Sequence, residues 1–125
     1  MQICRKIFKD DKVKNFLHID EYTNQSAELT LSLDVIFHLV EDEVYEKYMN
    51  NLFISSKKFV LIYSSNFDGK YSNITPHVRH RCFSDWIEKN FSEYKLINKI
   101  PNKYPYNKAD PDNTSFSEFF IYKRQ

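Results

Sequence analysis

The spacing of apolar residues changes twice between positions 29 and 63, and this change constrains the fold more than any other feature of the sequence. Over residues 29–37 apolar side chains recur at every second position, which is typical of a strand. Over residues 40–53 they follow helical spacing, and the acidic residues 41–43 lie in the first turn, where the helix dipole favours them. A continuous apolar run follows at residues 59–63. A strand, a helix and a buried strand in this order predict a β-α-β unit with parallel strands.

Further elements are predicted on both sides of this unit. Residues 2–8 have the spacing of a short helix, and the apolar run at residues 15–19 predicts a strand that ends at Asp20 and Glu21. Ser84 is a suitable N-cap for the next helix. The last two strands are expected at residues 94–100 and 115–123. The sequence therefore predicts an α/β fold with mainly parallel strands and a terminal, hairpin-like pair.

Length and charge narrow the choice of function. A chain of 125 residues predicts one domain, residues 1–125, with a single core. Its 18 basic and 17 acidic residues leave a net charge of +1, which argues against a dedicated nucleic-acid binder, because such proteins usually show a basic excess. No apolar stretch is long enough to span a bilayer, residues 1–12 lack the apolar core of a secretory signal, and Cys4 and Cys82 are isolated. We therefore expect a cytoplasmic protein that binds neither nucleic acid nor membrane.

The sequence contains a single glycine, Gly69. Loops that cradle phosphates or dinucleotides need two or three glycines close together, because their backbone must approach the ligand closely. The composition therefore excludes a Gly-rich binding loop within this chain.

Polar residues at the ends of predicted strands are the candidates for ligand binding. In open parallel sheets, ligands bind outside the carboxyl ends of the strands. Here Asp20 with Glu21, Asp34 with His38, and residues 64–66 lie at the ends of predicted strands. Each also has a simpler interpretation, since Asp20 and Asp34 can complete turns and His38 can cap or pack at the start of the helix.

The loop PHVRHRC, residues 76–82, contains two histidines and a cysteine. It lacks the fourth ligand and the ligand spacing of a structural zinc site, so no metal is expected there. Arg79 and Arg81 could instead bind an anionic group, or the loop could simply be solvated.

The stretch LTLSLDVIFHLVEDEVYEKYMNNLF, followed by FVLIYSSN, resembles the middle of a class I S-adenosylmethionine-dependent methyltransferase. In that family the fourth strand ends in a pattern similar to LDVIFHL, a helix crosses over, and the fifth strand follows. NFLHIDEY resembles the third strand, HRCFSDWIEKNFSEYKLINKIP the fifth helix and sixth strand, and SEFFIYK the antiparallel seventh strand. The resemblance covers nearly the whole chain and implies a Rossmann-like methyltransferase fold.

The resemblance also implies roles for particular residues. Asp20, with Glu21 beside it, would read the adenine amine of S-adenosylmethionine. His38 would lie close to the substrate as a base, a role for which histidine is the most common side chain. Three residues at the end of the fourth strand would lie beside the amino-acid end of the cofactor: Leu33, Asp34 and Val35.

The chain departs from the family at its N-terminal side. The family's Gly-rich loop after the first strand, and the acidic residue after the second that holds the ribose, have no counterpart here. In the family's sheet order, 3-2-1-4-5-7-6, the first two strands would then be missing from a partial fold, and the strand at residues 29–37 would have an unpaired apolar edge. We therefore expect the C-terminal part of a longer enzyme, from a truncated or split reading frame, that is marginally stable or self-associates through this edge.

Together these observations predict a methyltransferase fragment. The full-length enzyme would transfer a methyl group from S-adenosylmethionine to a small-molecule or saccharide acceptor. This chain alone would bind the cofactor weakly or not at all and would be inactive. The alternative is a non-catalytic interaction module derived from a methyltransferase, which pairs with a partner chain or a second copy through the exposed sheet edge.

Overall fold

The computed structural model describes residues 1–69 and 76–125. Its helices and strands follow in the order α1 (Gln2–Ile7), β1 (Ala27–Leu33), α2 (Asp42–Ile54), β2 (Ser56–Ser64), α3 (Phe83–Asn90), β3 (Tyr94–Ile100) and β4 (Glu118–Arg124). Three short 3-10 helices lie between them: η1 (Ile19–Glu21), η2 (Ile36–His38) and η3 (Pro111–Asn113). None of the helices in the described residues is long and apolar enough to cross a membrane.

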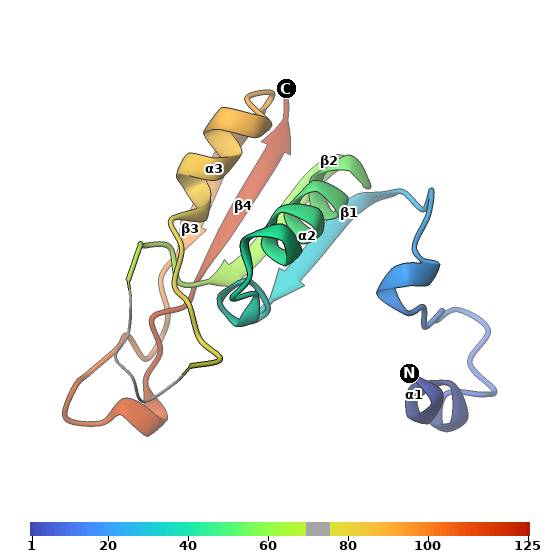
Figure 1. Ribbon diagram of the computed structural model, residues 1–125, viewed down its shortest axis with the longest axis horizontal. Helices are drawn as coiled ribbons and strands as arrows, with labels where there is room; N and C mark the ends of the chain where they lie inside the picture. The colour runs from blue at the N-terminus through green and yellow to red at the C-terminus, as the bar shows by residue number, and fades with distance from the viewer. Residues whose placement is uncertain (70–75) are drawn as a thin grey trace.

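The four strands form one open sheet in the order β1-β2-β4-β3 (Figure 1). β1 and β2 are parallel and are joined by α2, which confirms the predicted β-α-β unit. β4 is antiparallel to both of its neighbours, so β3 runs in the same direction as β1 and β2. This mixed α/β sheet fits a partial Rossmann-like fold.

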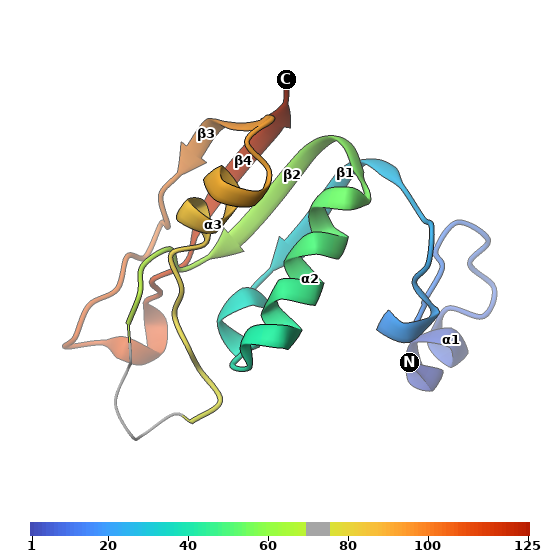
Figure 2. The same ribbon diagram turned by 45° about the horizontal axis from the view of Figure 1, so that its top comes forward.

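One face of the sheet is covered by α2 and α3, which both lie in front of it in Figure 1 and Figure 2. Phe53 of α2 is 1% exposed, and its ring centroid lies 5.0 Å from those of Phe91 and Tyr94. Alternate strand side chains point into the same core because side chains on a strand have a period of two. The buried apolar residues of the strands and of α3 are Val60, Ile62, Phe83, Ile87, Tyr94, Phe120 and Tyr122.

No element within the described residues covers the opposite face of β1. Leu29, Leu31 and Leu33 point to this face and are 45%, 52% and 50% exposed. Leu61 of β2 pairs with Leu31 and is only half-buried. We call these four residues the leucine face. Its apolar side chains remain in contact with water although they belong to the most regular part of the sheet.

The two edges of the sheet differ in chemistry. The β3 edge carries Lys95 and Lys99, and a bulge interrupts its pairing with β4 between Leu96 and Asn98. Charged side chains and bulges both discourage the addition of a further strand. β1, at the other edge, contains a single charged residue, Glu28.

The backbone of β1 leaves hydrogen-bonding groups at this second edge. The Asp34 N–H donates to the Tyr63 carbonyl of β2 over 2.9 Å. Because successive N–H groups of a strand point to opposite sides, those of Leu31 and Leu33 point away from β2. Within the described residues β1 has no partner on this side, as predicted.

The predicted strand at residues 15–19 is wrong. Residues 15–18 have no regular structure, and Ile19, Asp20 and Glu21 form η1. The His18 ring accepts a hydrogen bond from the Asp20 N–H, and the Glu21 carboxylate accepts one from the His18 N–H over 2.7 Å, which closes a capped turn. A short apolar run forms a strand only where a neighbouring strand satisfies its backbone, and no strand lies beside it within the described residues.

Predicted boundaries also differ from the structure, since β4 begins at Glu118 and not at residue 115. The N-cap of α3 is Cys82, not Ser84, because the backbone and hydroxyl of Ser84 are both bonded to the Asn66 side chain. β1 ends at Leu33 instead of continuing to residue 37, because Asp34 has a φ of 56°, a left-handed conformation that interrupts a strand.

Candidate functional site

The candidate site lies where the parallel strands β1 and β2 end. Asp34 follows β1 in the left-handed conformation, which Asp and Asn tolerate better than most residues. Its Oδ1 accepts a hydrogen bond from Ser117 Oγ over 3.1 Å. Ser117 is 2% exposed and directly precedes β4. The start of the antiparallel strand is thus tied to the end of β1.

Asn102 extends this network to β3. Its Nδ2 donates to the Tyr63 hydroxyl oxygen over 2.7 Å and to the Ser117 carbonyl over 2.9 Å. The network joins groups near one end of each of the four strands, all at the same end of the sheet. Such a satisfied polar network fixes the position of the groups around it.

The loop at residues 76–82 lies at the same end of the sheet. Hydrogen bonds clamp it to the junction between β1 and α2. The backbone N–H of Arg79 donates to the Phe37 carbonyl over 2.8 Å. Arg81 donates to the Val40 carbonyl over 2.8 Å and to Asp42 Oδ1 over 2.7 Å. Hydrogen bonds from Arg81, together with the charge of Arg79, hold the pKa of the Asp42 carboxyl below its usual value. The Arg79 guanidinium also donates to the Val40 carbonyl and to Asp42, so both guanidinium groups are engaged by groups of this chain.

Arg81 also explains why this loop is ordered against α2. Its side chain is 11% exposed, and its guanidinium carbon lies 4.5 Å from the centroid of the Tyr45 ring. A cation over an aromatic face adds electrostatic attraction to the hydrogen bonds. The clamp places His80, the residue before Arg81, beside the end of β2.

His80 forms a close pair with Ser65. His80 Nδ1 and Ser65 Oγ are 2.6 Å apart, and Ser65 is 1% exposed. The rings of Phe67 and Phe116 pack on the imidazole, with centroids 4.7 Å and 5.6 Å away. Burial lowers the pKa of His80 from its ordinary value of 6.5 and so favours the neutral imidazole. A neutral imidazole can accept a hydrogen bond or a proton.

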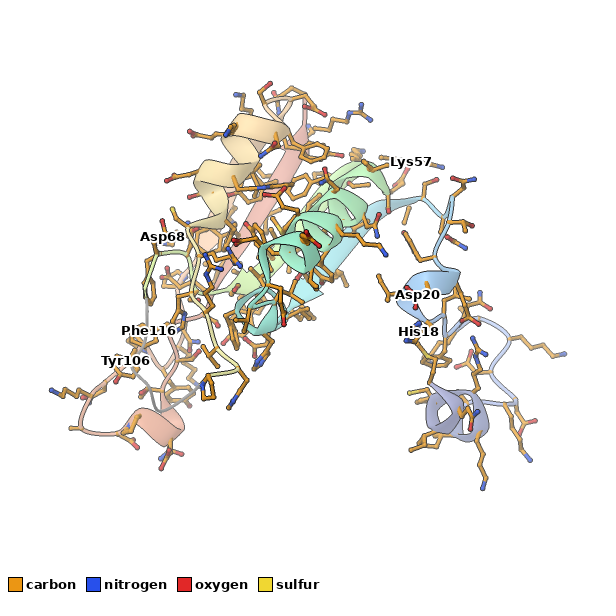
Figure 3. All side chains as sticks on the ribbon, in the orientation of Figure 1. His18, Asp20, Lys57, Asp68, Tyr106 and Phe116 are labelled. Atoms are coloured by element: carbon orange, nitrogen blue, oxygen red, sulfur yellow. The ribbon has the colours of Figure 1, made fainter. Side chains whose placement is uncertain are left out.

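These groups border a cavity of about 370 Å³. Figure 3 shows Tyr106 and Phe116, two of its lining residues, close together at the end of the molecule where these loops lie. The cavity is lined by Phe37, Ser65, Val78, His80, Tyr106, Pro111, Thr114, Ser115, Phe116 and Ser117.

His38 lies beside this cavity but does not line it. It is the last residue of η2, and its side chain is exposed. Its ring packs on Phe37, with centroids 4.5 Å apart, and faces His77 at 6.4 Å. The imidazole that does line the cavity is that of His80.

Of the predicted cofactor site, the structure brings together only the residues at the end of β1. Asp34 is exposed at the end of β1, with Leu33 before it on the leucine face and the half-buried Val35 after it. Asp20, by contrast, lies on η1 at the other side of the molecule from Tyr106 and Phe116 (Figure 3).

The environment of Asp20 and Glu21 is that of a surface turn. Asp20 is 3.1 Å from His18 Nδ1 and 4.0 Å from Lys47 Nζ. The hydrogen bond from the His18 backbone and the one from Arg5 hold the pKa of the Glu21 carboxyl below its usual value. These contacts match the simpler interpretation of Asp20 as a turn residue.

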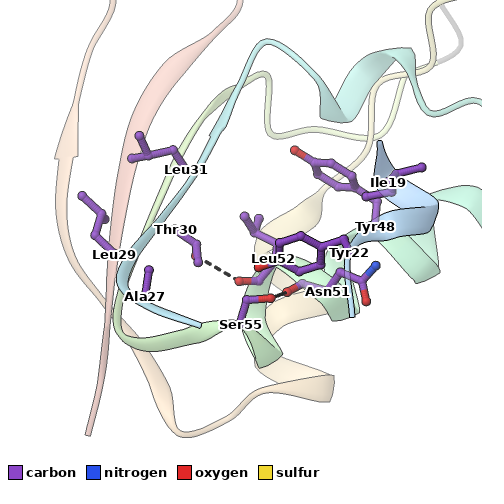
Figure 4. A pocket seen from close by; sticks show the side chains of 10 residues that line it. All are labelled: Ile19, Tyr22, Ala27, Leu29, Thr30, Leu31, Tyr48, Asn51, Leu52 and Ser55. Carbon is purple, nitrogen blue, oxygen red and sulfur yellow. Dashed lines mark hydrogen bonds between the residues drawn. The ribbon is translucent and has the colours of Figure 1, made fainter. Parts of the chain in front are cut away.

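A second cavity, of about 340 Å³, runs along the open edge of β1. Figure 4 shows that Ile19 and Tyr22 face α2 and β1 across it. On the strand side, the hydroxyl of Thr30 donates to the Leu52 carbonyl over 2.9 Å. The cavity therefore lies between the N-terminal segment and the edge that lacks a partner strand.

Sequence reasoning missed most of the first cavity. It identified residues 64–66 as a polar strand end, but His80 was considered only as a metal ligand, and Phe116 and Ser117 were predicted to belong to the last strand. No sequence signal connects Ser65 to His80, because their contact depends on the clamp made by Arg81. Within the described residues no group of three His, Cys, Asp or Glu side chains could hold a metal ion.

Comparison with known proteins identifies no family for this chain. No protein-family model, no curated protein and no solved structure matches it. Any assignment of function therefore depends on the fold and on the geometry of the site.

Proposed function

We propose that this chain forms the C-terminal half of a cytoplasmic S-adenosylmethionine-dependent methyltransferase. The observation that supports the proposal is the order and direction of the strands. An antiparallel β4 lies between the two parallel strands β2 and β3, and β1 occupies the far edge. The methyltransferase family that the sequence resembles has strands four, five, seven and six in this order, with the seventh antiparallel.

The residues present fit part of a cofactor site. Asp34 offers an exposed carboxylate at the carboxyl end of β1, where a ligand of an open parallel sheet binds. The cofactor's amino-acid end carries an ammonium group, which this carboxylate would attract. Leu33 and Val35 would flank it. The only glycine of the chain, Gly69, lies outside β1 and its ends, so a Gly-rich loop would have to come from another segment.

The open edge and the leucine face are the positions where that other segment would pack. A strand added to β1 would satisfy the outward N–H groups of Leu31 and Leu33, and a helix following it would cover the leucine face. We expect methyl transfer only when both halves are present. The chain alone would bind the cofactor through the Asp34 side of the site, with low affinity.

A titration of the ¹⁵N-labelled chain with S-adenosylhomocysteine, followed by NMR, tests this proposal. Amide shifts are expected around Asp34 and Val35, with saturation at millimolar ligand. Equal concentrations of ATP serve as the control, because ATP has the adenosine moiety but not the amino acid. The absence of shifts at millimolar ligand, or the same shifts with ATP, would contradict the proposal.

Two carboxylate variants sharpen the test. Asp34→Asn keeps the left-handed conformation and the bond from Ser117 but removes the charge, so it should weaken binding about tenfold, as expected for the loss of a charged hydrogen bond. Asp112→Asn on η3 removes an exposed charge elsewhere and should leave binding unchanged. Equal effects of the two substitutions would exclude a specific role for Asp34.

A second candidate function, a non-catalytic interaction module, is favoured by the contrast between the two sheet edges. β3 is protected by lysines and a bulge, whereas β1 offers apolar side chains and outward N–H groups next to an open cavity. A strand of a second copy or of a partner chain could add there.

The mass of the chain in solution, measured by sedimentation over a range of concentrations, tests this second candidate. Self-association through β1 should be abolished by Leu31→Lys and unaffected by Leu96→Lys. The two leucines are a matched pair, because Leu96 on β3 is 48% exposed and Leu31 is 52% exposed. A chain that is monomeric at all concentrations and unfolds cooperatively would exclude self-association through this edge.

A further inference from the structure

The open face of the sheet continues beyond the leucine face onto β4 and β3. Residues that pair across neighbouring strands point to the same side of a sheet, so each leucine of β1 starts a row that crosses the open face. The first row consists of Leu29, Phe59, Lys123 and Lys95. The next two rows consist of leucine, isoleucine, tyrosine and phenylalanine side chains, with Asn98 as the single amide. None of the residues in these three rows is an acid.

Two lysines face each other in the first row. Lys95 and Lys123 are directly paired on β3 and β4, and both are exposed. Like charges directly opposite each other destabilise a sheet. Lys95 also blunts the β3 edge, but Lys123 lies on an inner strand, where edge protection gives no reason for a charge. An anionic partner on the open face would remove this repulsion.

Two further lysines extend the positive charge onto β2. Lys57 and Lys58 lie at the start of β2, directly before Phe59 of the first row. Lys58 Nζ lies 5.4 Å from the centroid of the Phe59 ring. We call Lys57, Lys58, Lys95 and Lys123 the basic end. None of these four lysines forms an ion pair with a carboxylate of the described residues.

The net charge of +1 does not reveal the basic end, because it sums charges from the whole chain. Figure 3 shows Lys57 at the end of the sheet opposite to Tyr106 and Phe116. Asp42 and Glu118 begin α2 and β4 at that other end, where β2 finishes. Positive and negative charges are thus partly separated along the strands.

The basic end is a line of charges across the sheet. Neighbouring strands are roughly 4.8 Å apart, so the lysines of β2, β4 and β3 follow one another at about this spacing. The phosphates along one strand of B-DNA are separated by roughly 3.4 Å along the helix axis, which is of the same order. A line of cations therefore fits a linear chain of phosphates better than it fits a single anion.

The apolar side chains next to the basic end provide a surface for flat rings. Phe59 is half-buried beside Lys123, and the Tyr63 and Phe119 rings of the third row have centroids 4.5 Å apart. The bases of a duplex are stacked inside it and would not reach this surface. Single strands expose their bases, and the proteins that bind them combine positive charge with aromatic side chains.

We propose that the basic end and the adjoining apolar rows bind single-stranded nucleic acid. Phosphates lie on the lysines and one base stacks on Phe59, from which the exposed Lys58 ammonium moves to a phosphate. This binding goes beyond the proposed function and does not rest on it, because β4 and β3 lie on the side of the sheet away from the open β1 edge. Three or four phosphate contacts at about −0.7 each give a slope of about −2 to −3 in a plot of log affinity against log salt.

Fluorescence anisotropy of a labelled eight-nucleotide oligothymidylate, titrated with the full chain at about 20–200 mM salt, tests the proposal. The dissociation constant should be about 1–100 μM, as is typical of binding to phosphates without sequence preference, and should show the stated slope. Polyglutamate of equal charge should compete at least about tenfold more weakly, because it has no rings for the apolar rows.

Three results would overturn the proposal. The first is the absence of binding at about 200 μM chain in low salt. The second is competition by polyglutamate as strong as that by unlabelled oligonucleotide, which would assign the surface to an acidic protein segment. The third is tighter binding to phosphatidylserine vesicles than to the oligonucleotide, which would assign it to an anionic membrane.

A pair of lysine variants tests the phosphate contacts. Lys123→Gln should weaken binding about threefold to tenfold and reduce the salt slope by about 0.7, the contribution of one phosphate. It also removes the repulsion with Lys95, so the chain should stay folded. Lys89→Gln changes an exposed lysine of α3, which covers the other face of the sheet (Figure 1), and should leave both quantities unchanged. Equal effects of the two substitutions would exclude the basic end as the site.

A pair of aromatic variants tests base stacking. Phe59→Leu keeps an apolar side chain but removes the ring, and it should weaken binding at least about fivefold, the lower end of the range for one stacked base. Tyr104→Leu changes a tyrosine that is 57% exposed and lies outside the three rows, so it should leave binding unchanged. Equal affinities of these two variants, each shown to be folded by circular dichroism, would overturn the stacking on Phe59.

Discussion

Leu31 and Ile62 lie on neighbouring strands but face opposite sides of the sheet, so truncating each to alanine tests whether only one face is a core. Ile62 is 0% exposed under the helices, and burial of this kind makes an isoleucine-to-alanine change cost about 2–5 kcal/mol of the free energy of unfolding. Leu31 is 52% exposed. Because full burial of a leucine is worth about 1.5–3 kcal/mol, half of that burial gives a loss of about 1 kcal/mol for Leu31→Ala.

Urea denaturation followed by far-UV circular dichroism measures both values. The midpoint of unfolding should fall clearly for Ile62→Ala and slightly for Leu31→Ala, at several protein concentrations. If Leu31→Ala costs as much as Ile62→Ala in a concentration-independent way, the leucine face is packed within the single chain, and the reasoning about an uncovered face is wrong. If the cost appears only at high protein concentration, a second copy covers this face.

Three further variants test the architecture of the site. Asp34→Ala should lower the free energy of unfolding, measured by urea denaturation, by about 2 kcal/mol, because it adds left-handed strain and removes the bond from Ser117. Asp34→Asn should change the same free energy by no more than about 0.5 kcal/mol. Arg81→Lys should lower the free energy of unfolding by about 1.5–3 kcal/mol, because an ammonium cannot reproduce the planar contacts of Arg81 with Val40, Asp42 and Tyr45. The same change at the more exposed Arg79 should lower it by less than about 1 kcal/mol. The lowered pKa of His80 means that the unfolded chain takes up a proton there first, so stability should fall as the pH decreases below 6.5 and should level off once the folded His80 is also protonated. His80→Gln should remove this component from the pH dependence of the unfolding midpoint, and an unchanged pH profile would contradict the burial of His80.

The parts of the fold that could be predicted depend on local patterns. The change in the spacing of apolar residues over positions 29–63 indicated β1, α2 and β2, and in the structure β1 and β2 are parallel. The prediction failed at residues 15–19, where the run is apolar enough for a strand but has no strand beside it. A strand needs a partner for its backbone groups, and no property of a short run shows whether that partner is present.

The candidate site was predicted only where it coincides with a strand end. Asp34 was recognised because it follows β1. Its bond to Ser117 joins residues 83 positions apart, and the pair of Ser65 and His80 joins residues 15 positions apart. Neither spacing is a recognised motif. His38 was predicted as the base because it follows the end of the predicted strand and because the family resemblance places this position near the substrate, whereas the structure places the imidazole of His80 in the cavity.

The sequence by itself determined the alternation of strands and helices, the balance of charge and the absence of a Gly-rich loop, because these properties belong to single residues or to short periodic segments. Only the tertiary structure decided that β4 lies between β2 and β3, that the β1 edge is open while the β3 edge is blunted, and that Ser65, His80, Tyr106 and Phe116 surround one cavity. These features depend on which segments, distant in sequence, gain the most by packing together. That choice is made by the burial of the whole core and not by the preferences of any one segment.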